Sequence, residues 1–127
     1  MEPLSYDYTD IVGLENAVLE DSWVRDLQVS PMSVRFALEL AVTPQHPRYS
    51  PFHPGEQYCY LEAVLFFESV TAISWTGRPA RSNVDPDGSI DFGNIDTLAR
   101  RTGQIVVIGE FGELALTTDK LPRVELE

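Results

Sequence analysis

The sequence predicts a mainly antiparallel all-β fold, either a two-sheet sandwich or a partly open barrel. Three observations lead to this prediction. Apolar side chains recur at every second position in several segments, which is the spacing of half-buried strands. Turn-forming residues separate these segments. Helical spacing is rare, so we expect about seven to nine strands and at most one or two short helices in a single domain, residues 1–127.

The clearest strand covers residues 33–43. Its apolar side chains alternate with a second set that faces the other way. Residues 23–30 precede it with a similar pattern, and Ser30 and Pro31 favour a turn between the two segments. We therefore expect a hairpin. The alternating apolar residues of the second strand are Val34, Phe36, Leu38, Leu40 and Val42.

A second hairpin is predicted after the proline-rich stretch in the middle of the chain. Residues 57–67 are apolar on both faces, as expected of a central strand or of a strand that crosses between sheets. Glu68 and Ser69 interrupt the pattern, and residues 70–75 then alternate again. We expect a tight turn between the two segments.

A third hairpin is predicted near the C-terminus. Residues 104–111 and 113–118 both read as strands, and Gly112 lies where a turn requires a glycine. Residues 124–126 follow a proline and predict a short edge strand.

Helical signals are confined to two segments. Residues 94–101 predict a short helix, because Ile95 and Leu98 lie three apart and a glycine follows. Residues 6–20 fit either a short helix or a strand. The predicted core combines apolar residues from all three hairpins: Trp23, Leu27, Phe36, Leu38, Leu40, Leu65, Phe67, Ile73, Trp75, Ile105, Val107, Leu114 and Leu116.

Composition narrows the function classes. The chain has 20 acidic and 9 basic residues, a formal net charge of −11, so its field repels nucleic acids and anionic membranes. This charge either keeps the protein soluble or prepares a face for a basic partner. A single cysteine and the lack of a secretory signal or long apolar run predict a soluble, cytoplasmic protein. We expect no cofactor.

One segment is similar to a calcium-binding loop. Asn83, Asp85 and Asp87 place side-chain oxygen atoms at alternate positions, and a glycine, an apolar residue and Asp91 follow. Against a cation site, the twelfth position is Asn94 rather than a glutamate, and no entering helix is predicted. The alternative is an ordinary turn between strands.

Catalytic patterns are missing from the sequence. His46, His53 and Cys59 lie within one region, but their spacing matches no compact zinc pattern and the cysteine lies in an apolar strand. We find no nucleophile elbow, phosphate-binding glycine loop or dinucleotide fingerprint. A non-catalytic role is therefore favoured over an enzyme.

Aromatic residues mark a candidate binding surface. The loop 43–56 holds four prolines together with Tyr49 and Phe52, and Tyr58 and Tyr60 start the next strand. These side chains either anchor a protein partner or a second copy of the chain, or fold back over the body as a lid.

The segments LEDSWVRDLQVS (residues 19–30) and HPGEQYCYLEAVLFFESV (residues 53–70) resemble a group of small bacterial β-rich proteins without assigned activity. The late segment Gly93-Asn94-Ile95-Asp96 belongs to the same resemblance. The chain also loosely resembles immunity proteins of bacterial toxin systems. That resemblance implies a small acidic β-rich protein that binds a basic toxin, and it supplies no catalytic residue.

Two hypotheses follow from the sequence. The first is a non-catalytic protein-interaction or regulatory protein, immunity-like in kind, with an acidic surface for its partner. The alternative is a small-ligand or cation-binding module, or an enzyme whose site assembles from scattered residues.

Overall fold

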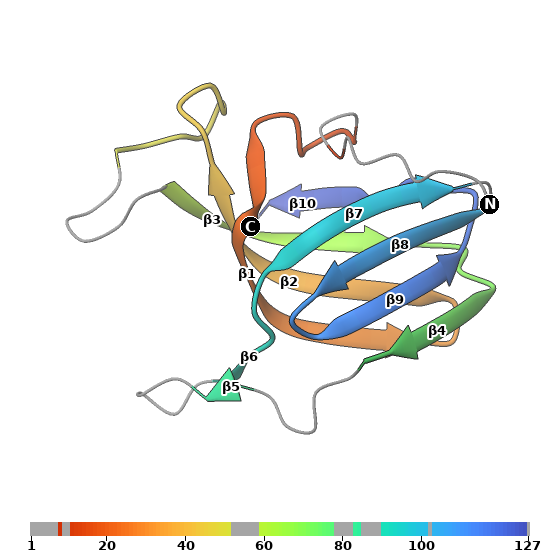
Figure 1. Cartoon of the computed structure of the whole chain (residues 1–127). Helices are drawn as coiled ribbons and strands as arrows, with labels where there is room; N and C mark the ends of the chain where they lie inside the picture. Colours follow the sequence, from red (N-terminus) through yellow and green to blue (C-terminus); the bar gives the residue numbers. More distant parts are fainter. Residues whose placement is uncertain are drawn as a thin grey trace.

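The computed structural model describes residues 8, 11–51, 59–77, 83–84, 90–101 and 103–126. It confirms the predicted all-β class: two four-stranded antiparallel sheets form a sandwich that is not a closed barrel (Figure 1). The strands are β1 (Ala17–Ser30), β2 (Ser33–Val42), β3 (Cys59–Phe67), β4 (Ala72–Thr76), β5 (Asn83–Val84), β6 (Ile90–Asp91), β7 (Ile95–Arg101), β8 (Gln104–Gly109), β9 (Gly112–Thr117) and β10 (Arg123–Leu126).

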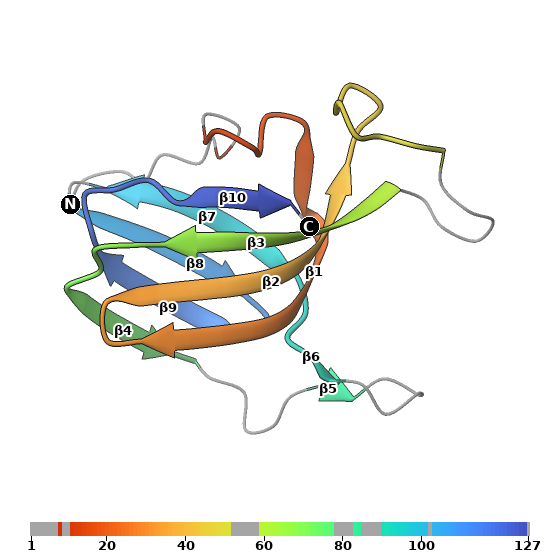
Figure 2. The same ribbon diagram turned by 180° about the vertical axis from the view of Figure 1, so that it is seen from behind.

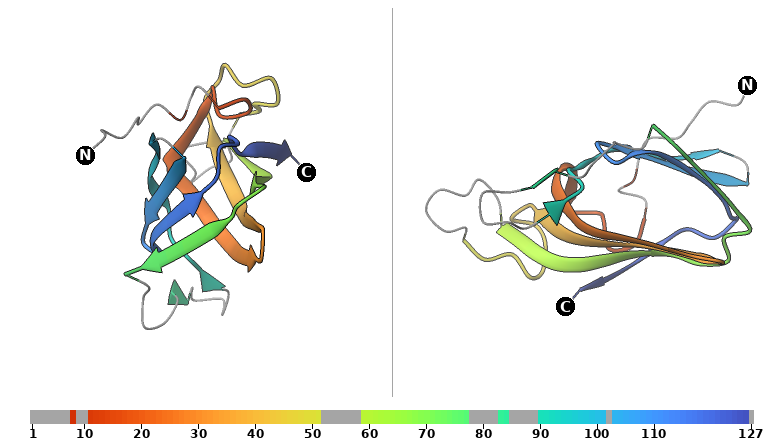
Figure 3. Two further views of the ribbon diagram at one scale, coloured as in Figure 1. Left: turned by 90° about the vertical axis from the view of Figure 1, so that its right-hand side faces the viewer. Right: turned by 90° about the horizontal axis from the view of Figure 1, so that it is seen from below.

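The two large sheets lie face to face. One has the order β1-β2-β3-β10 and is in front in Figure 2, and the other has the order β4-β9-β8-β7 and is in front in Figure 1. Figure 3 shows them edge-on as two layers. The short pair β5-β6 lies beside the sandwich. No helix in the described part of the chain is long and apolar enough to cross a membrane.

Two of the three predicted hairpins are confirmed. β1 pairs with β2, and β8 pairs with β9, both antiparallel. The predicted hairpin of β3 with β4 is wrong, because β4 pairs with β9 in the other sheet. Ser69 has a φ of 54°, and the Val70 N–H donates to the Met32 carbonyl, so the connection leaves the first sheet here. The alternation of apolar residues predicted strands β3 and β4 but did not identify the partner of β4.

The helix predicted at residues 94–101 is also wrong, since this segment is strand β7. Its pairing with β8 shifts register between Ile95 and Thr97. Such a bulge adds one residue to the strand and changes which face the following side chains occupy. Ile95 and Leu98 therefore both enter the core, although three residues separate them. A bulged strand thus reproduces helical spacing over a short distance.

Within the ambiguous segment 6–20, the described residues from Ile11 onward form successive turns followed by a strand. The Ile11, Leu14 and Ala17 N–H groups donate to carbonyls three residues earlier, and β1 starts at Ala17. Ile11 and Leu14 are buried in the core. The three-residue spacing comes from successive turns rather than from an α-helix, and no α-helix occurs among the residues described.

Both sheets contribute to one hydrophobic core. Phe36 lies at its centre, with ring centroids 5.9 Å from Phe67 and 5.5 Å from Phe111. Most predicted core residues are confirmed, but Leu27, Ile73 and Trp75 are only half-buried because they lie on edge strands. Buried residues that the prediction omitted include Leu14, Leu19, Val24, Ile95 and Phe111.

Trp23 is the clear error in the predicted core, because its side chain is 41% exposed. The pairing of β1 with β2 runs from Val18↔Ala41 directly to Trp23↔Glu39, so β1 carries extra residues at this point. After this irregularity, the side chains that would have faced the core face outward, and their neighbours face the core. Trp23 consequently faces outward beside Glu39, while Val24 is buried.

Ser22 replaces the hydrogen bonds that this irregularity interrupts. Its side chain is buried, its hydroxyl donates to the Val18 carbonyl at 2.7 Å, and the same oxygen accepts from the Ala41 N–H at 2.9 Å. One side chain therefore bridges β1 and β2 where the regular ladder fails.

We expect Ser22→Ala to lower the free energy of unfolding by about 1–3 kcal/mol, because the buried Ala41 N–H loses its partner. Urea denaturation followed by tryptophan fluorescence measures this change. Ser30→Ala, at the exposed end of the same strand, is the matched control and should change stability by less than about 0.5 kcal/mol. Equal effects of the two substitutions would contradict the bridging role of Ser22.

Candidate interaction surfaces

The structure describes half of the predicted aromatic surface. Tyr49 is half-buried and packs against the hydrophobic core, and Tyr60 is half-buried on β3 opposite Ala41. Phe52 and Tyr58 lie outside the described residues. The position of Tyr49 is that of a lid residue rather than of a side chain that projects into solvent.

The described part of this loop is hydrogen-bonded to the body. The Thr43 N–H donates to the Asn16 carbonyl at 2.9 Å, and the Asn16 amide donates to the Gln45 carbonyl at 3.4 Å. Turns within the loop join His46 to Thr43 and Tyr49 to His46. These bonds hold the first half of the loop against the turns that precede β1.

The predicted cation loop is described only at its two ends. Asn83 and Asp91 pair as backbone partners in the β5-β6 hairpin, whereas Asp85 and Asp87 lie outside the described residues. A hairpin at these ends agrees with the alternative prediction of a turn between strands. Within the described residues, no three His, Cys, Asp or Glu side chains gather in a way that could hold a metal ion.

Cys59 is buried at the start of β3, and its sulfur lies 3.9 Å from the Ser50 hydroxyl. His46 accepts a hydrogen bond from the Arg48 N–H through Nδ1, at 3.0 Å. His53 lies outside the described residues. The described partners of the cysteine and of His46 are thus local groups of the loop and the strand.

At the end of the sandwich where β1 meets the segment before β7, on the left in Figure 1, exposed acidic residues from neighbouring chain segments form a group. We call this group the Gly93 patch. Three chain segments contribute to it: β1, the start of β7, and the turn between β8 and β9. Its members are Glu20, Asp21, Asp96 and Glu110, all exposed.

Asn94 ties two of these segments together. Its side-chain amide donates to the Glu20 carbonyl at 2.6 Å and to the Asp96 carboxylate at 3.2 Å. The neighbouring Gly93 has a φ of 80°, and a Cβ there would lie 2.6 Å from the Cβ of Glu110. Only glycine fits this position, since it allows both the left-handed backbone and the close approach of Glu110.

Backbone hydrogen bonds fix the same junction. The Val24 N–H donates to the Gly93 carbonyl at 2.7 Å, and the Phe92 N–H donates to the Val24 carbonyl at 2.9 Å. Val24 thus faces two successive residues of the other segment, which is the two-against-one arrangement of a β-bulge in an antiparallel pair. It links β1 of one sheet to the segment that enters β7 of the other, so the carboxylates stand on a rigid frame.

Tyr8 completes the patch from the N-terminal side. Its hydroxyl accepts from the Leu19 N–H and lies 3.2 Å from both the Ala17 carbonyl and the Glu20 carboxylate. Burial raises the pKa of the Tyr8 phenol. The Leu19 hydrogen bond opposes this shift, and the negative charges of Glu20 and Asp21 add to it.

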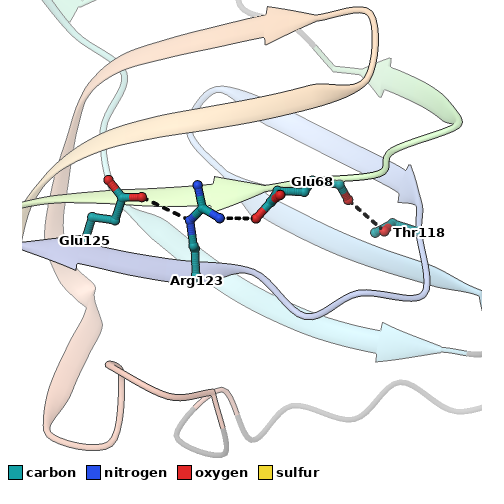
Figure 4. Close-up of polar contacts among 4 residues, drawn as sticks. All are labelled: Glu68, Thr118, Arg123 and Glu125. Atoms are coloured by element: carbon teal, nitrogen blue, oxygen red, sulfur yellow. Dashed lines mark hydrogen bonds and ion pairs between the residues drawn. The ribbon is translucent and has the colours of Figure 1, made fainter.

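A different charge arrangement covers the opposite end of the sandwich. Arg123 of β10 lies over the Phe66 ring, 4.7 Å from its centroid, and forms ion pairs with Glu68 and Glu125 (Figure 4). The Thr118 hydroxyl donates to the Glu68 carbonyl at 3.0 Å and so connects the end of β9 to the end of β3. Basic and acidic groups are paired here.

Sequence reasoning did not find the Gly93 patch. The adjacent Glu20 and Asp21 are unremarkable in so acidic a chain, and Asn94 and Asp96 fall in the segment that predicts a short helix. The sequence does indicate a turn here, because Gly93 and Asn94 are residue types that tolerate a left-handed backbone. Proximity to Glu20 could not be read from the sequence.

Comparison with protein-family models, with curated proteins and with solved structures finds no significant match to this chain. The candidate surfaces therefore rest on the geometry of the chain itself.

The raised pKa of Tyr8 predicts a loss of stability at alkaline pH. The folded state holds the phenolic proton more tightly than the unfolded chain, in which the tyrosine pKa is near 10.0. The stabilising effect of protonated Tyr8 is therefore fully present below pH 10.0 and is lost as the pH rises through the raised value.

We expect wild type to be more stable than Tyr8→Phe at neutral pH. The gap between their free energies of unfolding should narrow above pH 10.0. Urea titrations at several pH values measure this gap, and the four other tyrosines are shared by both proteins. A gap that stays constant with pH would show that Tyr8 does not titrate differently in the two states.

Proposed function

We propose that this chain is a non-catalytic protein-interaction protein that binds a basic protein partner through the Gly93 patch. The observation that carries the proposal is the convergence of four exposed carboxylates, from three segments, on one hydrogen-bonded junction. The whole-chain charge of −11 acts in the same direction, because it attracts a basic partner from a distance.

The surroundings of the patch support recognition of a cationic surface. Asn94 donates to the backbone carbonyl of Glu20 and Tyr8 donates to its carboxylate, so two neutral groups hold Glu20 in place. Carboxylates on a rigid frame lose little conformational entropy when a Lys- or Arg-rich surface docks. A bacterial immunity protein that neutralises a basic toxin is one form of this function.

Titration with a lysine-rich peptide, followed by calorimetry, tests the proposal. We expect Asp96→Asn/Glu110→Gln to weaken binding by about 3- to 10-fold, which corresponds to roughly 0.7–1.4 kcal/mol. The affinity of wild type should also fall as NaCl is raised.

The matched control is Asp119→Asn/Glu62→Gln, which removes the same two carboxylate types at other exposed positions. It should weaken binding by less than about twofold, since only the long-range field changes. If both double variants lose the same affinity, the acidic charge acts diffusely and serves solubility, and the patch is not a binding site.

A further inference from the structure

Three of the four edge strands of the large sheets carry features that oppose pairing with another chain. β1 has two register shifts and the exposed charges of Arg25 and Asp26. β7 has one register shift and exposed charges at Asp96 and Arg100. β10 has only four residues and exposes Arg123, paired with Glu68 and Glu125. Charges, bulges and short length are the usual protections of sheet edges.

Strand β4 is also short, with five residues, but it has neither charged side chains nor a register shift. Its residues Ala72, Ile73, Ser74, Trp75 and Thr76 include neither a charged residue nor a proline. Its pairing with β9 continues without a shift over all five residues, so the strand is regular. Every residue is exposed or half-buried. β4 is therefore the edge at which strand addition meets least resistance.

Both ends of β4 are anchored, so the edge is already formed. The Thr71 N–H donates to the Thr117 carbonyl at 2.9 Å, just before the strand. Near its end the Trp75 indole donates to the Phe111 carbonyl at 2.9 Å. Gly112 has a φ of 111°, and a Cβ there would lie 2.5 Å from the Thr76 carbonyl. Ordering this strand costs little on association.

We propose that β4 pairs with β4 of a second copy of this chain, antiparallel, around a two-fold axis at Ser74. This register places Ser74 opposite itself and Ile73 opposite Trp75 of the second copy. Aromatic and β-branched residues form favourable cross-strand pairs. The two half-buried side chains lie on the core side of the sheet, and they extend the apolar layer from one copy into the other.

Net charge limits the strength of this dimer. Two copies of charge −11 repel each other, and β4 contributes no charged side chain to the contact. A five-residue strand pair buries less than the roughly 1,200 Å² of the smallest stable interfaces. The dimer is therefore weak, and it tightens as salt screens the repulsion.

The salt dependence separates this dimer from the proposed binding of a basic partner. Attraction between opposite charges weakens with NaCl, whereas self-association of two acidic copies strengthens. Either proposal can thus fail without the other.

Cysteine cross-linking tests the register. Ser74→Cys places two thiols in directly opposed positions, with Cα atoms about 5 Å apart, within reach of a disulfide. Thr76→Cys is the matched control, because the two Thr76 positions of the dimer would lie roughly 13 Å apart along the paired strands. Under mild oxidation at high salt, Ser74→Cys should yield a covalent dimer, and Thr76→Cys and wild type, whose Cys59 is buried, should not.

Sedimentation provides the second measurement on unlinked protein. Wild type should tighten its dimerisation by at least about tenfold when NaCl rises from roughly 0.05 to 0.5 M. Ser74→Lys should remain monomeric, since two lysines would oppose each other at the axis. Ser30→Lys, at the exposed end of β1, makes the same charge change and should dimerise like wild type. Equal cross-linking of both cysteine variants, or unchanged association of Ser74→Lys, would overturn the proposal.

Discussion

The hydrogen bonds along the irregular stretch of β1 hold the two sheets in their relative positions. A strand that gains extra residues leaves backbone groups without ladder partners, and buried polar groups without partners are costly. Ser22 supplies the missing partners within the first sheet. Val24 then exchanges two backbone bonds with Phe92 and Gly93 from the second sheet. β1 thus belongs to one sheet and is joined to the other.

The surface chemistry at this end follows from that junction. Because β1 must approach the segment before β7, Glu20 and Asp21 are brought beside Asp96 and, across Gly93, beside Glu110. The hydrogen bonds of Tyr8 and Asn94 hold β1 to the neighbouring segments at this point. At the opposite end of the sandwich, Arg123 forms ion pairs with two glutamates.

The net charge and the open edge of β4 have opposite effects on association. Charge of one sign keeps copies apart and draws basic molecules closer, while an uncharged regular edge favours backbone pairing. The surrounding ionic strength sets the balance, since it screens the charge and leaves the backbone hydrogen bonds of the edge unchanged.

Alternation of apolar residues was sufficient to determine the all-β class, the β1-β2 and β8-β9 hairpins and most of the core, because side-chain direction in a strand is a local property. Tertiary structure decided what local pattern could not: that β4 joins β9, that Trp23 faces outward, and that Ile95 and Leu98 belong to a bulged strand. Strand partners and register depend on contacts far apart in sequence. The Gly93 patch depends on the same contacts, because Asn94 and Glu20 are separated by 74 positions.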